Sequence, residues 1–415
     1  MEGSPRKVGY TSSARWKHVQ EIIEEIEGPL RELPKALLTP DAAERLPRRV
    51  TDGLWRLRHA ALSGGLTTSA IRLRAWPILL STYVHSSEVA AQTAAAARRG
   101  VGAGIGIGAE LRDEQQVAKD VARCLWEANG RVLGDHERES KRAALTDVLL
   151  TAIAALGEDK VYYYQGLHDV GAGLVVGLPE TRKSTMTGMT PACAAMVALL
   201  SARLAPYCTQ GLEVTLAAMD KVMELVGAAA PALHAYLTNA GVPAVFCMPW
   251  LLSLFAHNID DSEVVFRLWD ACFATHPAFV LYLAATLVID AEDELMALGD
   301  DMASLHHRLS HLLADGRLSQ ASVDGVILRA LQLAHAFPPR ELLADTDTFP
   351  HAFTAWPERW AGSPPAHLTE LGALQAEMPP PLRAMRPASG TRAAMVVVGL
   401  TTIAAIVASW FLQSE

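Results

Sequence analysis

The segment RAALTDVLLTAIAAL, residues 142–156, has the pattern that decides the fold class. Its apolar side chains recur at intervals of three and four residues, which places them on one face of an α-helix. A second segment, DDSEVVFRLWDACF at residues 260–273, repeats this spacing. The sequence has no convincing run of alternating apolar and polar residues, the pattern typical of half-buried strands. It therefore predicts an all-α fold.

Length and composition limit the class of protein. The 415 residues are enough for one large domain with tails or for two ordinary domains, and half of them are apolar. The net charge of -9 argues against a nucleic-acid binder, which would need a basic face. The five cysteines include no C-x-x-C pair, which favours buried thiols over a disulfide framework or a zinc site.

The C-terminal region contains an uncharged apolar run, AAMVVVGLTTIAAIVASWFL, at residues 393–412. A helix of about 20 residues spans about 30 Å, the hydrocarbon thickness of a bilayer. Arg383, Arg386 and Arg392 precede the run, so the positive-inside rule leaves the bulk of the chain in the cytosol. We therefore expect a transmembrane tail anchor; the alternative is a buried C-terminal core helix. Its moderate apolarity suits a thin membrane such as the endoplasmic reticulum.

Changes in composition divide the chain into parts. In chain order we expect an N-terminal extension with one helix (1–50), a helical domain (51–345), a proline-rich cytosolic tether (346–392) and the anchor (393–412). Within the extension, the helix is expected near residues 19–26, with a proline-rich break that begins at Pro29. The helical domain is interrupted by a low-complexity Ala/Gly insertion at about residues 86–109.

Two segments suggest other functions. GVGAGIGIGA, residues 100–109, lacks the preceding strand, the following helix and the Gly-Lys-Ser/Thr ending of a nucleotide-binding loop, so a flexible insertion is favoured. His307 and His311 lie four residues apart, as zinc ligands on a helix do, but no glutamate base lies between them and no third ligand is evident. We therefore predict no metal site.

Two further segments carry residues suited to catalysis. In QQVAKDVARCLWE, residues 115–127, a helix would bury valines and place Asp120 and Arg123 together on its polar border. An aspartate at this spacing can fix the direction of a guanidinium group, although taken alone the pair reads as an ordinary surface ion pair. VYYYQGLHDV, residues 161–170, introduces an aromatic-glutamine-glycine corner between helices.

Together these segments resemble the two catalytic fingerprints of the TBC-domain Rab GTPase-activating proteins, I-x-x-D-x-x-R and Y-x-Q-G. This chain has one conservative change, from Ile to Val, and its residues are Val117, Asp120, Arg123, Tyr163, Gln165 and Gly166. Two other segments resemble the family's opening Arg/Trp segment and its W-x-x-x-x-F and R-x-W-D block. Their structural residues are Arg72, Trp76, Trp250, Phe255, Arg267, Trp269 and Asp270. The resemblance implies an all-α, multi-helix TBC domain.

In that family an arginine and a glutamine are supplied in trans to the GTPase. The resemblance implies that Arg123 is the arginine finger and that Gln165 positions the attacking water. Supporting roles are implied for Asp120, Tyr163, Gly166 and Asp169. Asp120 would hold the arginine, Tyr163 would pack the corner down, and Gly166 would let the backbone approach the partner. Asp169 would either cap the next helix or make a contact.

Such a protein needs no cofactor or metal of its own, because it lends residues to the Mg–GTP site of a Rab and has no substrate pocket. The resemblance is closest to a tail-anchored member of the endoplasmic reticulum. It implies a Rab1-type partner in the GTP state, at that membrane or the early Golgi, and a role in vesicle transport between them. The alternative is a membrane-anchored scaffold that binds a Rab without activating it, since the insertion directly precedes the finger helix. A membrane enzyme that uses the glycine-rich segment is a third class.

Overall fold

The structure is a computed structural model that describes residues 12–32, 47–81, 111–128, 130–178, 189–344 and 348–354. Three expected features lie outside these ranges: the membrane anchor (393–412), the Ala/Gly insertion (86–109) and the tether (346–392) apart from residues 348–354.

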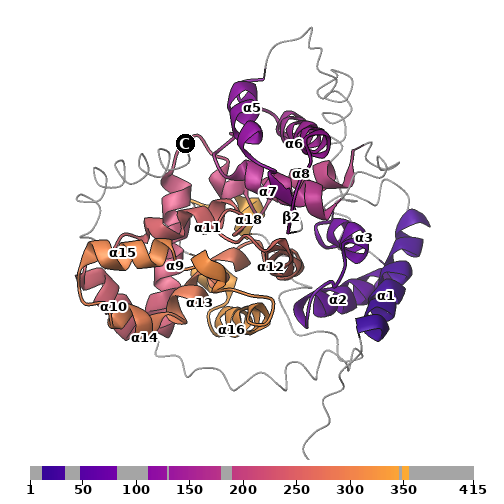
Figure 1. Cartoon of the computed structure of the whole chain (residues 1–415). Coiled ribbons are helices and arrows are strands. Elements are labelled where there is room, and N and C mark those ends of the chain that lie inside the picture. The colour runs from indigo at the N-terminus through magenta and orange to yellow at the C-terminus, as the bar shows by residue number, and fades with distance from the viewer. Residues whose placement is uncertain are drawn as a thin grey trace, which may run out of the picture.

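Helices make up most of the described chain, which confirms the predicted all-α fold (Figure 1). The helices are α1 Ser12–Glu32, α2 Arg48–Leu62, α3 Ser69–Leu79, α5 Glu114–Arg123, α6 Asp135–Leu156, α7 Leu167–Gly177, α8 Pro191–Ser201, α9 Glu213–Ala229, α10 Pro231–Asn239, α11 Met248–Leu252, α12 Ser262–Ala274, α13 Phe279–Ile289, α14 Glu292–Met296, α15 Met302–Ser310, α16 Val323–Ala336, α17 Pro339–Leu342 and α18 His351–Thr354. Single 3-10 turns occur at η3 Ala205–Tyr207, η4 Ala244–Cys247 and η5 Ala314–Gly316. Two very short antiparallel strands, β1 Glu127–Ala128 and β2 Arg131–Val132, were not expected; Glu127 pairs with Val132 and Ala128 with Arg131.

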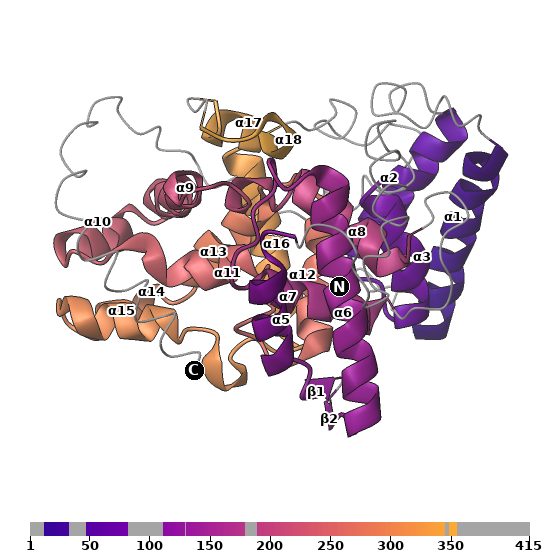
Figure 2. The ribbon, with the colours of Figure 1, turned by 90° about the horizontal axis from the view of Figure 1, so that it is seen from above.

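The helices are arranged around α12 and α13. Helices α1, α2 and α3 lie on one side of this centre, and α9, α10 and α15 on the other, in both views (Figures 1 and 2). α13 is buried from Phe279 to Val288 and packs against α9 and α16, as its continuous apolar sequence predicts for a core helix. α5, which carries the first fingerprint, lies beside α6.

The N-terminal helix is longer than the sequence suggested. α1 begins at Ser12 and continues through Pro29 to Glu32, so the expected break at that proline is wrong. A proline inside a helix removes one backbone hydrogen bond, but the next residue, Leu30, is buried. Burial of that side chain favours continuing the helix against α2. The two helices approach closely at Gly53, where an added Cβ would lie 2.6 Å from Cγ1 of Ile26.

The residues of the Arg/Trp segment and the R-x-W-D block form one buried polar cluster. Asp270 is fully buried and accepts hydrogen bonds from Trp76 Nε1 (2.7 Å), the backbone N of Leu66 (2.8 Å) and Arg72 Nε (3.3 Å). Arg72 also forms an ion pair with Glu263 at 2.7 Å. These bonds join α3 to α12.

Beneath the corner of residues 161–166 lies a second corner, at the end of α11. Leu254 and Phe255 are buried and adopt positive φ angles of 48° and 69°, which non-glycine residues rarely do. Trp269 Nε1 donates to the Leu254 carbonyl at 2.9 Å, and Tyr164 Oη donates to the Leu252 carbonyl at 2.9 Å. This strained turn therefore supports the tyrosine-glutamine segment from below.

In the part of the chain that the structure describes, we find no single helix long and apolar enough to cross a bilayer. Among the described helices, one pair, Pro231–Asn239 with Ala244–Leu252, is long and apolar enough when taken together, but it is bent by 117°.

Candidate functional site

Helix α5 presents an arginine at its C-terminal end. Val117 and Val121 are buried, and the Arg123 side chain is 43% exposed. Its Nη2 donates to Oδ1 of Asp120 at 2.6 Å, as the three-residue spacing predicted. Asp120 was expected on the polar border of the helix but is fully buried. A buried carboxylate gives the guanidinium a more rigid support than an exposed one, because water does not compete for its oxygens.

Burial of Asp120 is possible because three side chains donate to it. Besides Arg123, Gln116 Nε2 donates to Oδ1 at 3.1 Å and the Tyr163 hydroxyl donates to Oδ2 at 2.8 Å. A buried charge of this kind is tolerated only when its lone pairs are paired. The tyrosine lies 43 residues along the chain, so this bond joins the two fingerprints.

The tyrosines of the corner each have a different partner. Tyr162 N donates to the Cys208 carbonyl at 2.9 Å, and Tyr163 N donates to Asp113 Oδ2 at 3.1 Å. Burial, together with the charge of Asp120, raises the pKa of Tyr163 well above its usual value. The hydroxyl therefore stays protonated and keeps donating to Asp120. Tyr163 does more than pack the corner: it holds the carboxylate that holds the arginine.

A glycine is needed at position 166 because of the backbone conformation there, and not because a side chain would lack space. Gly166 has a φ of 104° and is the N-cap residue of α7, a conformation that side chains disfavour. The nearest atom to an added Cβ would be Leu252 Cβ at 3.8 Å, an ordinary contact. The sharp turn leaves Gln165 half-buried, immediately before α7 and two residues from Tyr163.

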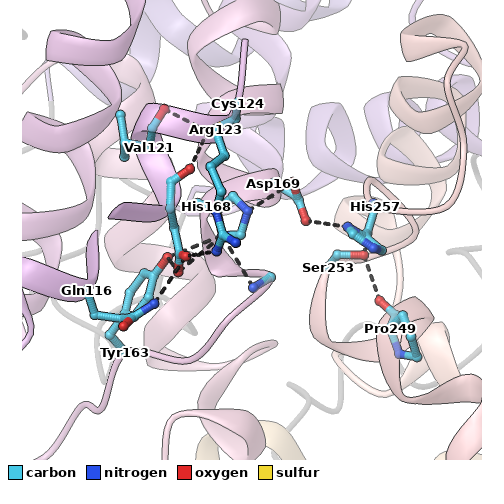
Figure 3. A network of polar contacts seen from close by, with 12 residues as sticks. Gln116, Val121, Arg123, Cys124, Tyr163, His168, Asp169, Pro249, Ser253 and His257 are labelled. Carbon is cyan, nitrogen blue, oxygen red and sulfur yellow. Dashed lines mark hydrogen bonds and ion pairs between the residues drawn. The ribbon is translucent and has the colours of Figure 1, made fainter. Parts of the chain in front are cut away.

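Asp169 makes a contact and does not cap α7. Its Oδ2 lies 3.0 Å from Nδ1 of His257, and its Oδ1 lies 3.5 Å from Nε2 of His168. Figure 3 shows these residues between Arg123 and Tyr163 on one side and Ser253 on the other. Neither histidine was a predicted site residue. The Q-G-x-H-D sequence was the available signal for His168, whereas His257 lies 88 residues from its carboxylate partner.

The segment after α5 is also fixed. Leu125 has a φ of 61°, and Arg142 Nε donates to the Cys124 carbonyl at 3.0 Å. The guanidinium groups of Arg138 and Arg142 lie 4.4 and 5.0 Å from the ring centre of Trp126, which is 56% exposed. These contacts from α6 hold the end of the helix that carries Arg123.

A cavity of about 210 Å³ lies between the β1–β2 hairpin and α7. Leu125, Ala172 and Phe266 are among its lining residues, with Asp169 at its edge. Pockets for small molecules usually have volumes of about 300–1,000 Å³. The volume of this cavity lies below that range.

The ion pair between His257 and Asp169 makes stability depend on pH. The hydrogen bond to Asp169 raises the pKa of His257 above 6.5. The pair therefore stabilises the fold fully below the unfolded pKa, and this contribution is lost as pH rises through the folded pKa. Because the histidine is 39% exposed, we expect an effect of only roughly 0.2–1 kcal/mol.

We predict that His257→Gln lowers the melting temperature relative to the wild type more at about pH 6 than at about pH 8. In an Asp169→Asn background the same substitution should show no such difference between the two pH values. If the melting temperature of His257→Gln falls further below that of the wild type as pH rises, the ion pair between His257 and Asp169 is contradicted.

Comparisons with known proteins agree with the fold. The family model described as Rab-GTPase-TBC domain matches residues 69–296, more than half of the 415-residue chain. TBC1 domain family member 20 from Mus musculus is 30% identical over 287 residues, 69% of this chain and 64% of that protein. GTPase-activating protein gyp10 from Schizosaccharomyces pombe is 30% identical over 215 residues, 50% of this chain and 53% of that protein. The chain thus matches less than two thirds of the length of these relatives.

A solved structure confirms the fold independently. The crystal structure of the Ypt/Rab-GAP domain of Gyp1p superposes with a TM-score of 0.51 over 75% of this chain and 97% of that one, at 13% identity. At this identity the likeness shows the fold alone. With the match of the family model over residues 69–296, it completes the assignment: the chain belongs to the Rab-GTPase-TBC domain family.

Proposed function

We propose that this protein accelerates GTP hydrolysis by a Rab GTPase, to which it supplies Arg123 and Gln165 in trans. The observation that carries the proposal is the hydrogen bond between Tyr163 and Asp120, at 2.8 Å. It joins α5, which carries the exposed Arg123, to the segment before α7 that carries the half-buried Gln165.

The role of Arg123 is electrostatic. Negative charge spreads over the phosphoryl oxygens in the transition state of GTP hydrolysis, and an arginine supplied in trans is worth about 10³–10⁵ in rate. Asp120 restrains the guanidinium at 2.6 Å, which reduces the entropy lost when the arginine enters the partner's site.

The role of Gln165 is to orient the attacking water with a neutral amide, which can donate and accept hydrogen bonds. We predict that Gln165→Ala lowers the stimulated rate about 10²-fold, since deleting one oriented catalytic hydrogen bond typically costs about 10²–10³. Gln20→Ala on the remote helix α1 is the matched control and should leave the rate unchanged. Single-turnover phosphate release measures the rate with each variant. If Gln165→Ala is as active as Gln20→Ala, the glutamine has no catalytic role.

The finer assignment concerns the partner and the membrane. We propose a Rab1-type GTPase in its GTP state as substrate, at the membrane of the endoplasmic reticulum in transport to the Golgi. The support is the likeness to TBC1 domain family member 20 and the apolar sequence of residues 393–412, which is long enough to span a bilayer. The substrate is the Mg–GTP held by the Rab, and the chain would contribute no cofactor of its own.

The test is a screen of the full chain, reconstituted in lipid vesicles, against a panel of GTP-loaded Rab GTPases. We expect strong acceleration of phosphate release with a Rab1-type GTPase and weaker acceleration with others. Binding to a Rab without acceleration would instead identify a membrane-anchored scaffold. Acceleration confined to a different Rab would overturn the partner but not the mechanism.

A further inference from the structure

His168 occupies a position that the roles of Arg123 and Gln165 do not explain. It is the second residue of α7, and its side chain is only 13% exposed. We propose, on the basis of the function above, that His168 is a positioning residue that sets the arginine finger and the glutamine corner relative to each other.

One ring nitrogen of His168 contacts the second fingerprint at two points. Nδ1 lies 3.2 Å from the Tyr163 hydroxyl, which donates to Asp120 Oδ2 and so supports the arginine. The same nitrogen accepts a hydrogen bond from the backbone N–H of Gly166 at 3.4 Å, directly after Gln165. A change in the place of this atom would therefore move the arginine support and the glutamine corner apart.

The other ring nitrogen faces Asp169, the next residue of α7, whose carboxylate also contacts His257. Because a backbone N–H only donates, Nδ1 acts as the acceptor from Gly166, and we assign the ring proton to Nε2. Nε2 lies 3.5 Å from Asp169 Oδ1, and the other oxygen of that carboxylate lies 3.0 Å from His257 Nδ1. The imidazole is thus held at both edges.

His257 is itself attached to the turn after α11. Its backbone N donates to Ser253 Oγ at 3.1 Å, and that hydroxyl donates to the Pro249 carbonyl at 2.7 Å. Figure 3 shows this chain of contacts running from Pro249 across His257, Asp169 and His168 to the arginine side. It connects the finger helix to the buried, strained turn of residues 254–255.

The contacts of His168 indicate which substitution should preserve the stimulated rate of GTP hydrolysis. Asparagine places a polar atom near the position of Nδ1 and can keep the contacts to Tyr163 and Gly166. Glutamine reaches toward the position of Nε2 and can keep only the contact to Asp169. Leucine fills the space but keeps neither. A positioning role through Nδ1 therefore predicts rescue by asparagine and not by glutamine or leucine.

The experiment measures kcat and KM of stimulated GTP hydrolysis for the full chain in lipid vesicles, with the GTP-loaded Rab that responds best. A misplacement of about 1 Å can cost about 10²-fold in rate. We expect His168→Leu and His168→Gln to lower kcat about 10–100-fold with KM within about twofold of the wild type, and His168→Asn to stay within about threefold in kcat. His234→Leu, at a half-buried histidine on α10, is the control and should change neither.

Three results would overturn the proposal. The first is a wild-type kcat in His168→Leu, and the second is a change in KM with no change in kcat. The third is an equal loss of kcat in all three His168 variants that parallels the loss in their melting temperatures. If the leucine variant does not fold, the asparagine and glutamine pair decides. Absence of any acceleration by the wild type would instead refute the proposed function itself, so the two failures are distinguishable.

Discussion

Replacing Arg123 with alanine should reduce stimulated GTP hydrolysis about 10³–10⁵-fold while the chain stays folded and still binds the GTPase. The side chain is 43% exposed, so its removal opens no cavity in the core. The substitution leaves Asp120 with its bonds from Tyr163 and Gln116, which keeps the buried carboxylate paired. Single-turnover phosphate release, together with a binding measurement on the GTP-loaded Rab, tests both parts of the prediction.

Arg123→Lys is the informative companion. Lysine keeps the positive charge but loses the planar array of donors that can bond Asp120 and the phosphoryl oxygens at once. We expect it to recover only a small fraction of the rate. An alanine variant that retains most of the acceleration would show that another group stabilises the transition state.

The second large effect concerns the core. Asp270→Ala should lower the free energy of unfolding by about 3–5 kcal/mol, the usual cost of removing one partner from a buried ion pair. It leaves the Arg72 guanidinium, 3% exposed, without its buried carboxylate, and it leaves Trp76 Nε1 and the backbone N of Leu66 without their acceptor. Urea denaturation followed by circular dichroism measures the change.

The control is Asp290→Ala, which breaks an exposed ion pair with Arg329. Exposed pairs contribute roughly 0–1 kcal/mol, so this variant should remain close to the wild type. If Asp270→Ala is no less stable than Asp290→Ala, the buried cluster does not hold α3 against α12 in the way described.

The sequence was most informative where the signal is local. The apolar spacing in residues 142–156 predicted a one-faced helix, and Leu145, Val148 and Leu149 of α6 are indeed buried. The three-residue spacing of Asp120 and Arg123 likewise predicted their ion pair. Both follow from helix geometry alone.

Features that depend on distant partners could not be predicted in this way. Asp120 is buried because Tyr163, 43 residues later, covers it and donates to it. The contact between Asp169 and His257 joins residues 88 positions apart, and no local spacing indicates it. Pro29 was read as a break because local propensity disfavours proline in helices, but packing against α2 outweighed that propensity.

The short hairpin had a local signal that went unused. An Asn-Gly dipeptide at residues 129–130 is the strongest two-residue turn signal for a hairpin. Each flanking strand has only two residues, Glu127–Ala128 and Arg131–Val132, too few to produce an alternating apolar pattern. The prediction of strands from alternation therefore fails at this length.

The most direct test is capture of the transition state. Aluminium fluoride bound with GDP imitates the transferring phosphoryl group, and transition-state analogues bind about 10²–10⁸-fold more tightly than substrates. We predict that the full chain forms a stable complex with the GDP-bound Rab only when aluminium fluoride is present, and that Arg123→Ala and Gln165→Ala each weaken this complex. Equal binding with and without aluminium fluoride, unaffected by either substitution, would contradict the claim that these two side chains act on the partner's nucleotide.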